Sequence, residues 1–258
     1  MPHYLLVLFA QADLWDKLLS LGQGQDAIAT LVTLGLALVW LRLMDEIAHR
    51  GWLSPQLSRK IIHIGTGPLF VLCWPFFSEA DSARYFAAFV PLSITVQFVA
   101  IGLGWLKDPA AVQAMTRTGN PREILRGPLY YGLVFMVCTV VFWRTSPVGM
   151  MSLMMLCGGD GLADIVGRRL GRHKLPFNTD KSWAGSGAML GGSFMFAVGM
   201  LAWFNHLMLF TPSLNLGETA LRVGAIALVV TGVEALPLRD IDNLTITAIA
   251  VLLGIGLF

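Results

Sequence analysis

The chain ends one of its longest apolar runs with two carboxylates and follows them with basic residues, in the stretch GGDGLADIVGRRLGRHK at 158–174. Asp160 and Asp164 are four residues apart, so on a helix they share one face. Carboxylate oxygens are the ligands that Mg²⁺ takes from proteins. We therefore predict that Asp160 and Asp164 form the catalytic pair and hold Mg²⁺.

The glycines and basic residues around this pair have the chemistry of an anion site. Lys and Arg side chains bind phosphate, and the amides that open a helix favour negative charge. Glycines let a backbone or a ligand approach closely. We predict that the basic loop at 167–182 binds a polyphosphate, and the residues assigned to this site are Gly159, Gly161, Gly167, Arg168, Arg169, Lys174, Lys181 and Ser182.

A purely structural explanation competes with this one. In it, Asp160 pairs with a basic neighbour and Asp164 with Arg168 one helical turn on, while the glycines pack helices and the basic loop sets topology. The depth of Asp160 favours function. In a span that starts near Pro147, Asp160 lies roughly 20 Å along the helix. That is about 10 Å short of the boundary of a 30 Å hydrocarbon core, where a carboxylate is costly and usually marks a functional site.

The composition indicates a membrane protein. Hydrophobic residues make up 55% of the 258 residues and charged residues 13%, and the mean hydropathy is +0.67. A soluble domain carries about twice that charged fraction. We predict an all-α, polytopic helical membrane protein, with about eight transmembrane helices in one bundle and a single domain over 1–258, of which 1–26 is a poorly defined N-terminal segment. The predicted spans are 27–44, 61–77, 83–104, 127–143, 147–166, 183–203, 219–236 and 244–258.

The positive charges alternate along these spans. The segments 42–60, 105–126, 167–182 and 236–243 hold 4, 4, 5 and 1 Lys or Arg residues, and the remaining four of the 18 lie on the other side. This distribution places the four basic segments on the cytoplasmic or equivalent face. The segment 109–126 is too polar to span, and we predict an interfacial helix and a turn there, broken at Gly119-Asn120-Pro121.

Two further polar clusters fall on the same predicted face. Arg59, Lys60 and His63 lie at the start of the second span, and Glu234, Asp240, Asp242 and Asn243 lie between the last two spans. We assign accessory roles in the site to Arg59, Lys60, His63, Glu234, Asp242 and Asn243. Helix anchoring and N-capping are the ordinary alternatives for such residues. Glu234 is the most informative of them, because it lies inside an apolar run.

Several stretches resemble a known family, although no Walker, dinucleotide-binding or soluble-kinase motif is found. GDGLADIVGRRLGRHKLPFNTDKSWAGS is similar to the signature of the phytol kinases, which belong with dolichol kinase and the CTP-dependent diacylglycerol kinase to the polyprenol kinase group. RKIIH at 59–63, ILRGPLYYGLVF at 124–135 and the E-x-L-P…D-N-L-T pattern at 234–245 resemble further blocks of the family, in the same order. The resemblance covers roughly residues 58–247. By position, the predicted polyphosphate site matches the nucleotide-binding block of the family, so the resemblance implies that 167–182 is a nucleotide loop.

The resemblance implies an integral-membrane enzyme that phosphorylates an isoprenoid alcohol with CTP. The alcohol is phytol foremost, with geranylgeraniol or farnesol as alternatives, and Mg²⁺ is the expected cofactor. The expected partners are this alcohol, a nucleoside triphosphate and the lipid bilayer, with no nucleic acid; the oligomeric state is open. The N-terminal stretch has neither a basic n-region nor an Arg/Ser-rich pattern, so we expect no signal or transit peptide. We expect a bacterial membrane of the cyanobacterial type or a plastid membrane.

Two other functions stay open at this point. A membrane cytidylyltransferase acting on a lipid phosphate would release pyrophosphate from CTP, whereas a kinase would release CDP. A secondary transporter would use Asp160 in a coupling-ion site, but transporters tend to carry internal repeats, and none is evident here.

Overall fold

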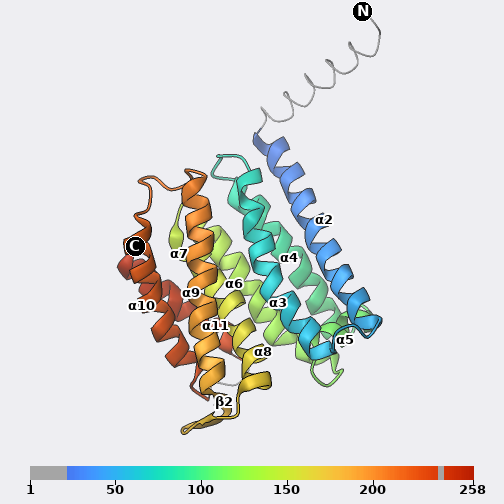
Figure 1. The fold of residues 1–258 in the computed structure, drawn as a ribbon. Coiled ribbons are helices and arrows are strands. Elements are labelled where there is room, and N and C mark those ends of the chain that lie inside the picture. The colour runs from blue at the N-terminus through green and yellow to red at the C-terminus, as the bar shows by residue number, and fades with distance from the viewer. Residues whose placement is uncertain (1–21, 238–240) are drawn as a thin grey trace, which may run out of the picture.

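The computed structural model describes residues 22–237 and 241–258. Most of the predicted N-terminal segment 1–26, and Asp240 in the polar cluster between the last two spans, lie outside the described residues. The long elements of the bundle are α2 (Gly22–His49), α3 (Pro55–Leu72), α4 (Ala83–Gly102), α6 (Gly127–Phe142), α7 (Pro147–Met154), the π-helical segment η3 (Met155–Asp160), α8 (Gly161–Leu170), α9 (Trp183–His206), α10 (Leu216–Glu234) and α11 (Asp242–Leu257). Figure 1 shows them packed side by side along one direction.

The predicted all-α polytopic class is confirmed, and each of the eight predicted spans coincides with a helix, with α7, η3 and α8 forming one continuous span. By length and composition, six of the described helices are able to cross a membrane. The two that fall short are α3 and α11. The first carries Arg59, Lys60 and His63 and is therefore less apolar, and the second has 16 residues. The predicted count of about eight is thus approximate.

The continuous helix Pro147–Leu170 forms the centre of the bundle. Inside the protein, 83% of its most apolar stretch is buried, against 28–39% for the other five spanning helices. Those outer helices expose large apolar side chains such as Leu31, Val39 and Leu228. Apolar exposure of this kind suits lipid rather than water. Other helices therefore shield the central helix, which is the place where a buried charge such as Asp160 can be accommodated.

The connections at one end of the bundle contain the basic segments. Figure 1 places α5 (Pro109–Met115), the end of α8 and the hairpin of β1 (Lys174–Leu175) and β2 (Asn178–Ser182) together at this end. The helix and the turn predicted in 109–126 are present, because α5 and the short 3₁₀ helix η2 (Pro121–Leu125) flank a turn in which Gly119 has a φ of +80°. Their place at the membrane interface stays a prediction. The loop predicted at 167–182 differs: it continues α8 and then forms an antiparallel hairpin.

Candidate active site

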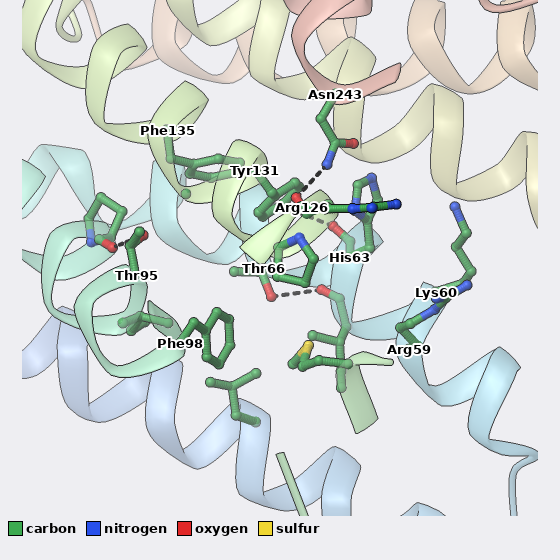
Figure 2. Close-up of a pocket in the computed structure, with 18 of the residues that line it drawn as sticks. Arg59, Lys60, His63, Thr66, Thr95, Phe98, Arg126, Tyr131, Phe135 and Asn243 are labelled. Carbon is green, nitrogen blue, oxygen red and sulfur yellow. Dashed lines mark hydrogen bonds between the residues drawn. The ribbon is translucent and has the colours of Figure 1, made fainter. Parts of the chain in front are cut away.

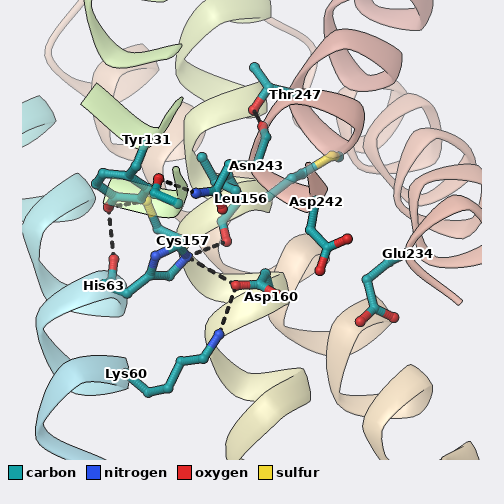
Figure 3. Close-up of polar contacts among 12 residues, drawn as sticks. Lys60, His63, Tyr131, Leu156, Cys157, Asp160, Glu234, Asp242, Asn243 and Thr247 are labelled. Carbon is teal, nitrogen blue, oxygen red and sulfur yellow. Dashed lines mark hydrogen bonds and ion pairs between the residues drawn. The ribbon is translucent and has the colours of Figure 1, made fainter. Parts of the chain in front are cut away.

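Asp160 lies at the centre of a polar cluster between α3 and the central helix. Its Oδ2 accepts a hydrogen bond from Lys60 Nζ at 3.0 Å and lies 3.3 Å from His63 Nε2. The same imidazole nitrogen is 3.3 Å from the carbonyl oxygen of Leu156. Because a carboxylate and a carbonyl can only accept, Nε2 carries the hydrogen that it shares with them. Figure 3 shows the three polar side chains converging.

The close approach of α3 to the central helix makes this cluster possible. A Cβ at Gly67 would lie 2.2 Å from Cys157 Sγ, and a Cβ at Gly161 would lie 2.1 Å from Ile64 Cγ1. Both positions therefore require glycine for the two helices to pack at this distance. The π-helical turn, a feature frequent at functional sites, ends at Asp160 itself. The local backbone thus brings Asp160 within reach of Lys60 and His63.

A second charged group lies beside the first and comes from three other elements. Lys181 of β2 forms an ion pair with the buried carboxylate of Glu234 at the end of α10, and its Nζ is 4.0 Å from Asp242 Oδ2 at the start of α11. Burial alone would lower the pKa of Lys181, but Glu234 and Asp242 raise it above its usual value, so the ammonium stays charged. Asp242 lies between Asp160 and Glu234 in Figure 3.

The predicted pair Asp160 and Asp164 divides between two environments. Asp164 Oδ1 accepts a hydrogen bond from Arg168 Nε at 3.0 Å on the surface of α8, as the structural alternative expected. Arg169 and Lys174 are exposed. The basic residues at 167–182 thus do not converge on Asp160, except for Lys181, which is within electrostatic range of it. The roles assigned to these residues stay predictions.

The remaining predicted residues of the nucleotide loop have visible packing roles. Gly159 is buried, and a Cβ there would collide with Ser193. Gly167 lies against Ser182, and Ser182 caps α9 by accepting a hydrogen bond from the amide of Gly185 at 3.2 Å. These contacts account for the residue types locally, and nucleotide binding by them stays a prediction.

A cavity of about 440 Å³ opens beside Asp160. Charged and polar side chains surround one end of it, and the predicted accessory residues Arg59, Lys60, His63, Asp242 and Asn243 are among them. Asn243 also ties α11 to α6 by donating to the carbonyl of Gly127 at 2.9 Å. Figure 2 shows Arg59, Lys60 and Arg126 on one side of the cavity and Phe98 and Phe135 on the other.

The other end of the cavity is apolar and points into the bundle. On each of the four helices that line it, the residues farthest from the charged end are Ala37 of α2, Phe70 of α3, Val90 of α4 and Phe135 of α6. From Lys60 to Phe70 the cavity follows α3 for about 15 Å, at 1.5 Å per residue. The cavity is therefore amphipathic, with charge at the end of the bundle and an apolar interior.

Sequence reasoning missed several residues of this cavity. Arg117 and Thr118 follow α5, Arg126 precedes α6, and Tyr131 donates a hydrogen bond to the carbonyl of His63 at 2.8 Å. Arg126 and Tyr131 lie in the stretch ILRGPLYYGLVF, whose family resemblance indicated a shared block without giving any residue a role. Arg117 lies in a segment that hydropathy assigned to the membrane surface. Among residues 22–237 and 241–258, no three His, Cys, Asp or Glu side chains are grouped closely enough to hold a metal ion by themselves.

Comparison with known proteins identifies relatives over most of the chain. The probable phytol kinase 1, chloroplastic, of Glycine max is 44% identical over 223 residues, which is 86% of this chain and 73% of the relative. The probable phytol kinase 1, chloroplastic, of Oryza sativa subsp. japonica is 44% identical over 91% of this chain and 74% of the relative. The phytol kinase 1, chloroplastic, of Arabidopsis thaliana is 41% identical over 90% and 77%. No family model and no solved structure matches the chain. With such identity over such a length, the chain belongs to the phytol kinase family.

Proposed function

We propose that this protein transfers the terminal phosphate of CTP to the hydroxyl group of an isoprenoid alcohol, phytol foremost, with the help of Mg²⁺. The observation that carries the proposal is the amphipathic cavity: one continuous space joins an apolar interior to a charged end beside Asp160. A lipid alcohol and a triphosphate have opposite solubilities. A site that serves both needs these two surfaces within one pocket.

The acceptor fits the apolar interior. Phe70, Ile94, Phe98 and Phe135 line it, and these side chains offer contact without hydrogen-bond partners. An isoprenoid chain bound there would place its hydroxyl at the charged end, close to Asp160 and Lys60. Phytol is the acceptor named for the relatives, which supports it as the substrate here. Their chloroplastic names likewise support a plastid-type membrane.

The reaction moves one phosphoryl group. The alcohol oxygen forms a bond to the terminal phosphorus, and the bond from that phosphorus to the oxygen of the diphosphate breaks. The hydroxyl proton passes to water, directly or through the Asp160 carboxylate. Catalysis of such transfers depends mainly on positioning and on neutralising charge. Lys60 lies beside Asp160, and Lys181 supplies a second positive charge nearby. The choice of CTP rests on the resemblance to the family.

The residues at the charged end fit Mg²⁺. This ion is usually held by one or two carboxylates together with substrate phosphates, so three protein ligands are not required. Lys60 and His63 both contact Oδ2 of Asp160, and Asp242 lines the same cavity. We propose Asp160 and Asp242 as the holding residues, because Asp164 pairs with Arg168 outside the cavity. When bound there, Mg²⁺ would neutralise charge on the transferred phosphate.

The test is an assay of purified protein in lipid nanodiscs with Mg²⁺, CTP or ATP, and phytol, geranylgeraniol or farnesol. We expect the alcohol monophosphate and CDP as products, with CTP preferred over ATP. Release of pyrophosphate would instead indicate a cytidylyltransferase. A preference for ATP would overturn the choice of donor and leave alcohol phosphorylation intact. Omission of Mg²⁺ with added chelator should abolish turnover, and activity that persists would contradict the metal proposal.

A further inference from the structure

Two arginines at the charged end of the cavity contact no counter-ion among the residues that the structure describes. Arg59 and Arg117 both line the cavity, and among residues 22–237 and 241–258 neither guanidinium makes a hydrogen bond or an ion pair. Lys60 and Arg168, in contrast, are held by Asp160 and Asp164. Unpaired guanidiniums beside a cavity are free to bind a ligand.

The charges around Arg59 favour the binding of an anion. Arg59 is half-buried, and two other cations, Arg117 and Arg168, are within electrostatic range of it. Asp160 and Asp164 oppose this repulsion only in part, since each carboxylate is already paired with another basic side chain. Like charges gathered in a partly buried site favour occupation by an anion.

Hydrogen bonds to the side chain of Glu123 fix the backbone at Arg117. The carboxylate of Glu123 accepts hydrogen bonds from the amide of Arg117 at 2.6 Å and from the amide and hydroxyl of Thr118. These contacts fix the backbone of the turn between α5 and η2. Glu123 is within electrostatic range of the Arg117 guanidinium but forms no ion pair with it. The turn therefore presents the arginine at the cavity.

We propose that Arg59 and Arg117 bind the phosphate chain of the nucleotide donor, so that the segment 105–126 is part of the donor site. The proposal rests on the proposed function and places the phosphates at the cavity, which the arginines of the predicted nucleotide loop at 167–182 do not line. Arginine binds phosphate oxygens through two parallel hydrogen bonds, and two arginines can hold neighbouring phosphates.

The test compares Arg59→Gln and Arg117→Gln with a matched control, Arg122→Gln. Arg122 is exposed on η2, close in sequence to Arg117, but does not line the cavity. We expect each cavity variant to raise the KM for CTP at least tenfold and to leave the KM for phytol within twofold. Arg117→Lys should give an intermediate KM, since it keeps the charge but loses the paired hydrogen bonds. The control should match the wild type.

A binding measurement separates this inference from the proposed function. Inorganic triphosphate should raise the melting temperature of the wild type, and this shift should shrink in Arg117→Gln whether or not any alcohol is phosphorylated. An unchanged shift and an unchanged KM in both cavity variants would overturn the inference. So would a rise in the KM for CTP that appears in Arg169→Gln but not in Arg117→Gln.

The apolar end of the cavity carries a second inference independently. The rings of Phe70 and Phe135 lie 5.8 Å apart, and both side chains are at most 5% exposed. Beyond them, Val71 of α3, Trp74 of the short 3₁₀ helix η1 (Trp74–Phe76) and Cys138 of α6 belong to the buried hydrophobic core. We infer that Phe70 and Phe135 form the end wall of the chain site and limit the length of alcohol that fits. This inference also rests on the proposed function.

The measured quantity is the ratio of kcat/KM for a longer and a shorter isoprenoid alcohol. Phe135→Ala or Phe70→Ala should shift this ratio about tenfold towards the longer alcohol, since hydrophobic pockets discriminate single methylenes by that order. Phe77→Ala, at the opposite end of the bundle, is the control and should leave the ratio unchanged. The ratio does not depend on how much of the protein folds. An unchanged ratio in both cavity variants would therefore overturn the inference that Phe70 and Phe135 limit the length of the alcohol. Absence of any alcohol kinase activity would instead contradict the proposed function.

Discussion

Both ends of the bundle bury charged groups, but the two groups differ in what surrounds them. At the end opposite the cavity, Arg144 is 6% exposed and donates hydrogen bonds to the carbonyl oxygens of Trp74, Phe77 and Ser78, at 3.1, 2.7 and 2.8 Å. Asp26 is fully buried and accepts from the amide and the hydroxyl of Ser78, at 2.7 and 2.9 Å. This network joins α2, the connection after α3 and the connection after α6.

At the opposite end of the bundle, the paired side chains of Asp160 and Lys60 line the cavity. Asp160 is held by Lys60 and His63, yet it also lines a cavity together with Asp242, Arg59 and Arg117. Within the part of the chain that the structure describes, these two arginines form no ion pair. In the network of Arg144 the hydrogen bonds go to backbone carbonyls. These bonds stabilise the buried charge, which then has a structural role. Burial of charge is therefore a poor sign of function by itself. The informative feature is charge that remains available to a ligand.

The largest expected effect is that of Asp160→Asn on catalysis. The amide keeps an oxygen for Lys60 but removes the negative charge, so we expect kcat to fall about a thousandfold, which corresponds to about 4 kcal/mol of transition-state stabilisation. The melting temperature should change little. A well-folded variant with near-native turnover would place Asp160 in the same structural class as Arg144.

Arg144→Met should show the opposite pattern. The change keeps an unbranched side chain of similar length but removes the Arg144 donor from all three carbonyl groups. The carbonyl of Trp74 keeps the hydrogen bond from the Phe77 amide at 3.2 Å, whereas those of Phe77 and Ser78 lose their donor, so we expect the free energy of unfolding to fall by about 3 kcal/mol. The fraction of protein that folds should retain kcat for the alcohol within twofold. Thermal unfolding followed by tryptophan fluorescence, with turnover per folded molecule, measures both. Loss of turnover at normal stability would contradict the structural role of Arg144.

Asp26→Asn should give a smaller loss of stability at the same end. Asparagine can accept from either Ser78 donor but not from both as a carboxylate does, and the hydrogen bonds lose their charge assistance. We expect about 2 kcal/mol of destabilisation, with turnover unaffected. The same unfolding assay applies, and Asp81→Asn, an exposed residue on the same side, is the control. Equal stability of the two variants would show that the Asp26 contacts contribute nothing.

Asp164→Asn should have the smallest effect and sharpens the assignment of the metal site. Asp164 forms an exposed pair with Arg168, and such pairs contribute about 0–1 kcal/mol. If Asp160 and Asp242 hold Mg²⁺, the variant should keep kcat within about threefold and show an unchanged Mg²⁺ concentration dependence. A large rise in the Mg²⁺ requirement would restore the pairing of Asp160 with Asp164 that the sequence spacing suggested.

Much of the fold could be predicted because it depends on one-dimensional signals. Apolar runs of about 20 residues predicted the positions of the helices. The alternation of basic segments predicted that Arg59, Lys181 and Asp242 lie at the same end of the bundle. The hairpin at 174–182 was not predicted, because its strands are short and their only apolar anchor, Leu175, is buried by tertiary contact. The sequence also explains why α3 is too polar to count as a membrane-spanning helix, because Arg59, Lys60 and His63 lie within it.

By itself, the sequence determined the class of protein, the helix order and the family, because bilayer crossing and a long specific motif are both local properties of the chain. The catalytic role that it assigned to Asp160 stays a prediction. The tertiary structure decided which groups share a space. Asp164, four residues from Asp160, faces Arg168 on the surface, while Lys60, a hundred residues away, contacts Asp160 directly. The tertiary structure also shows that Arg144 is hydrogen-bonded to carbonyl groups, whereas Arg117 lines a cavity. The reason is physical: spacing along a helix fixes direction, but only the packing of distant helices fixes which charges are paired and which remain free.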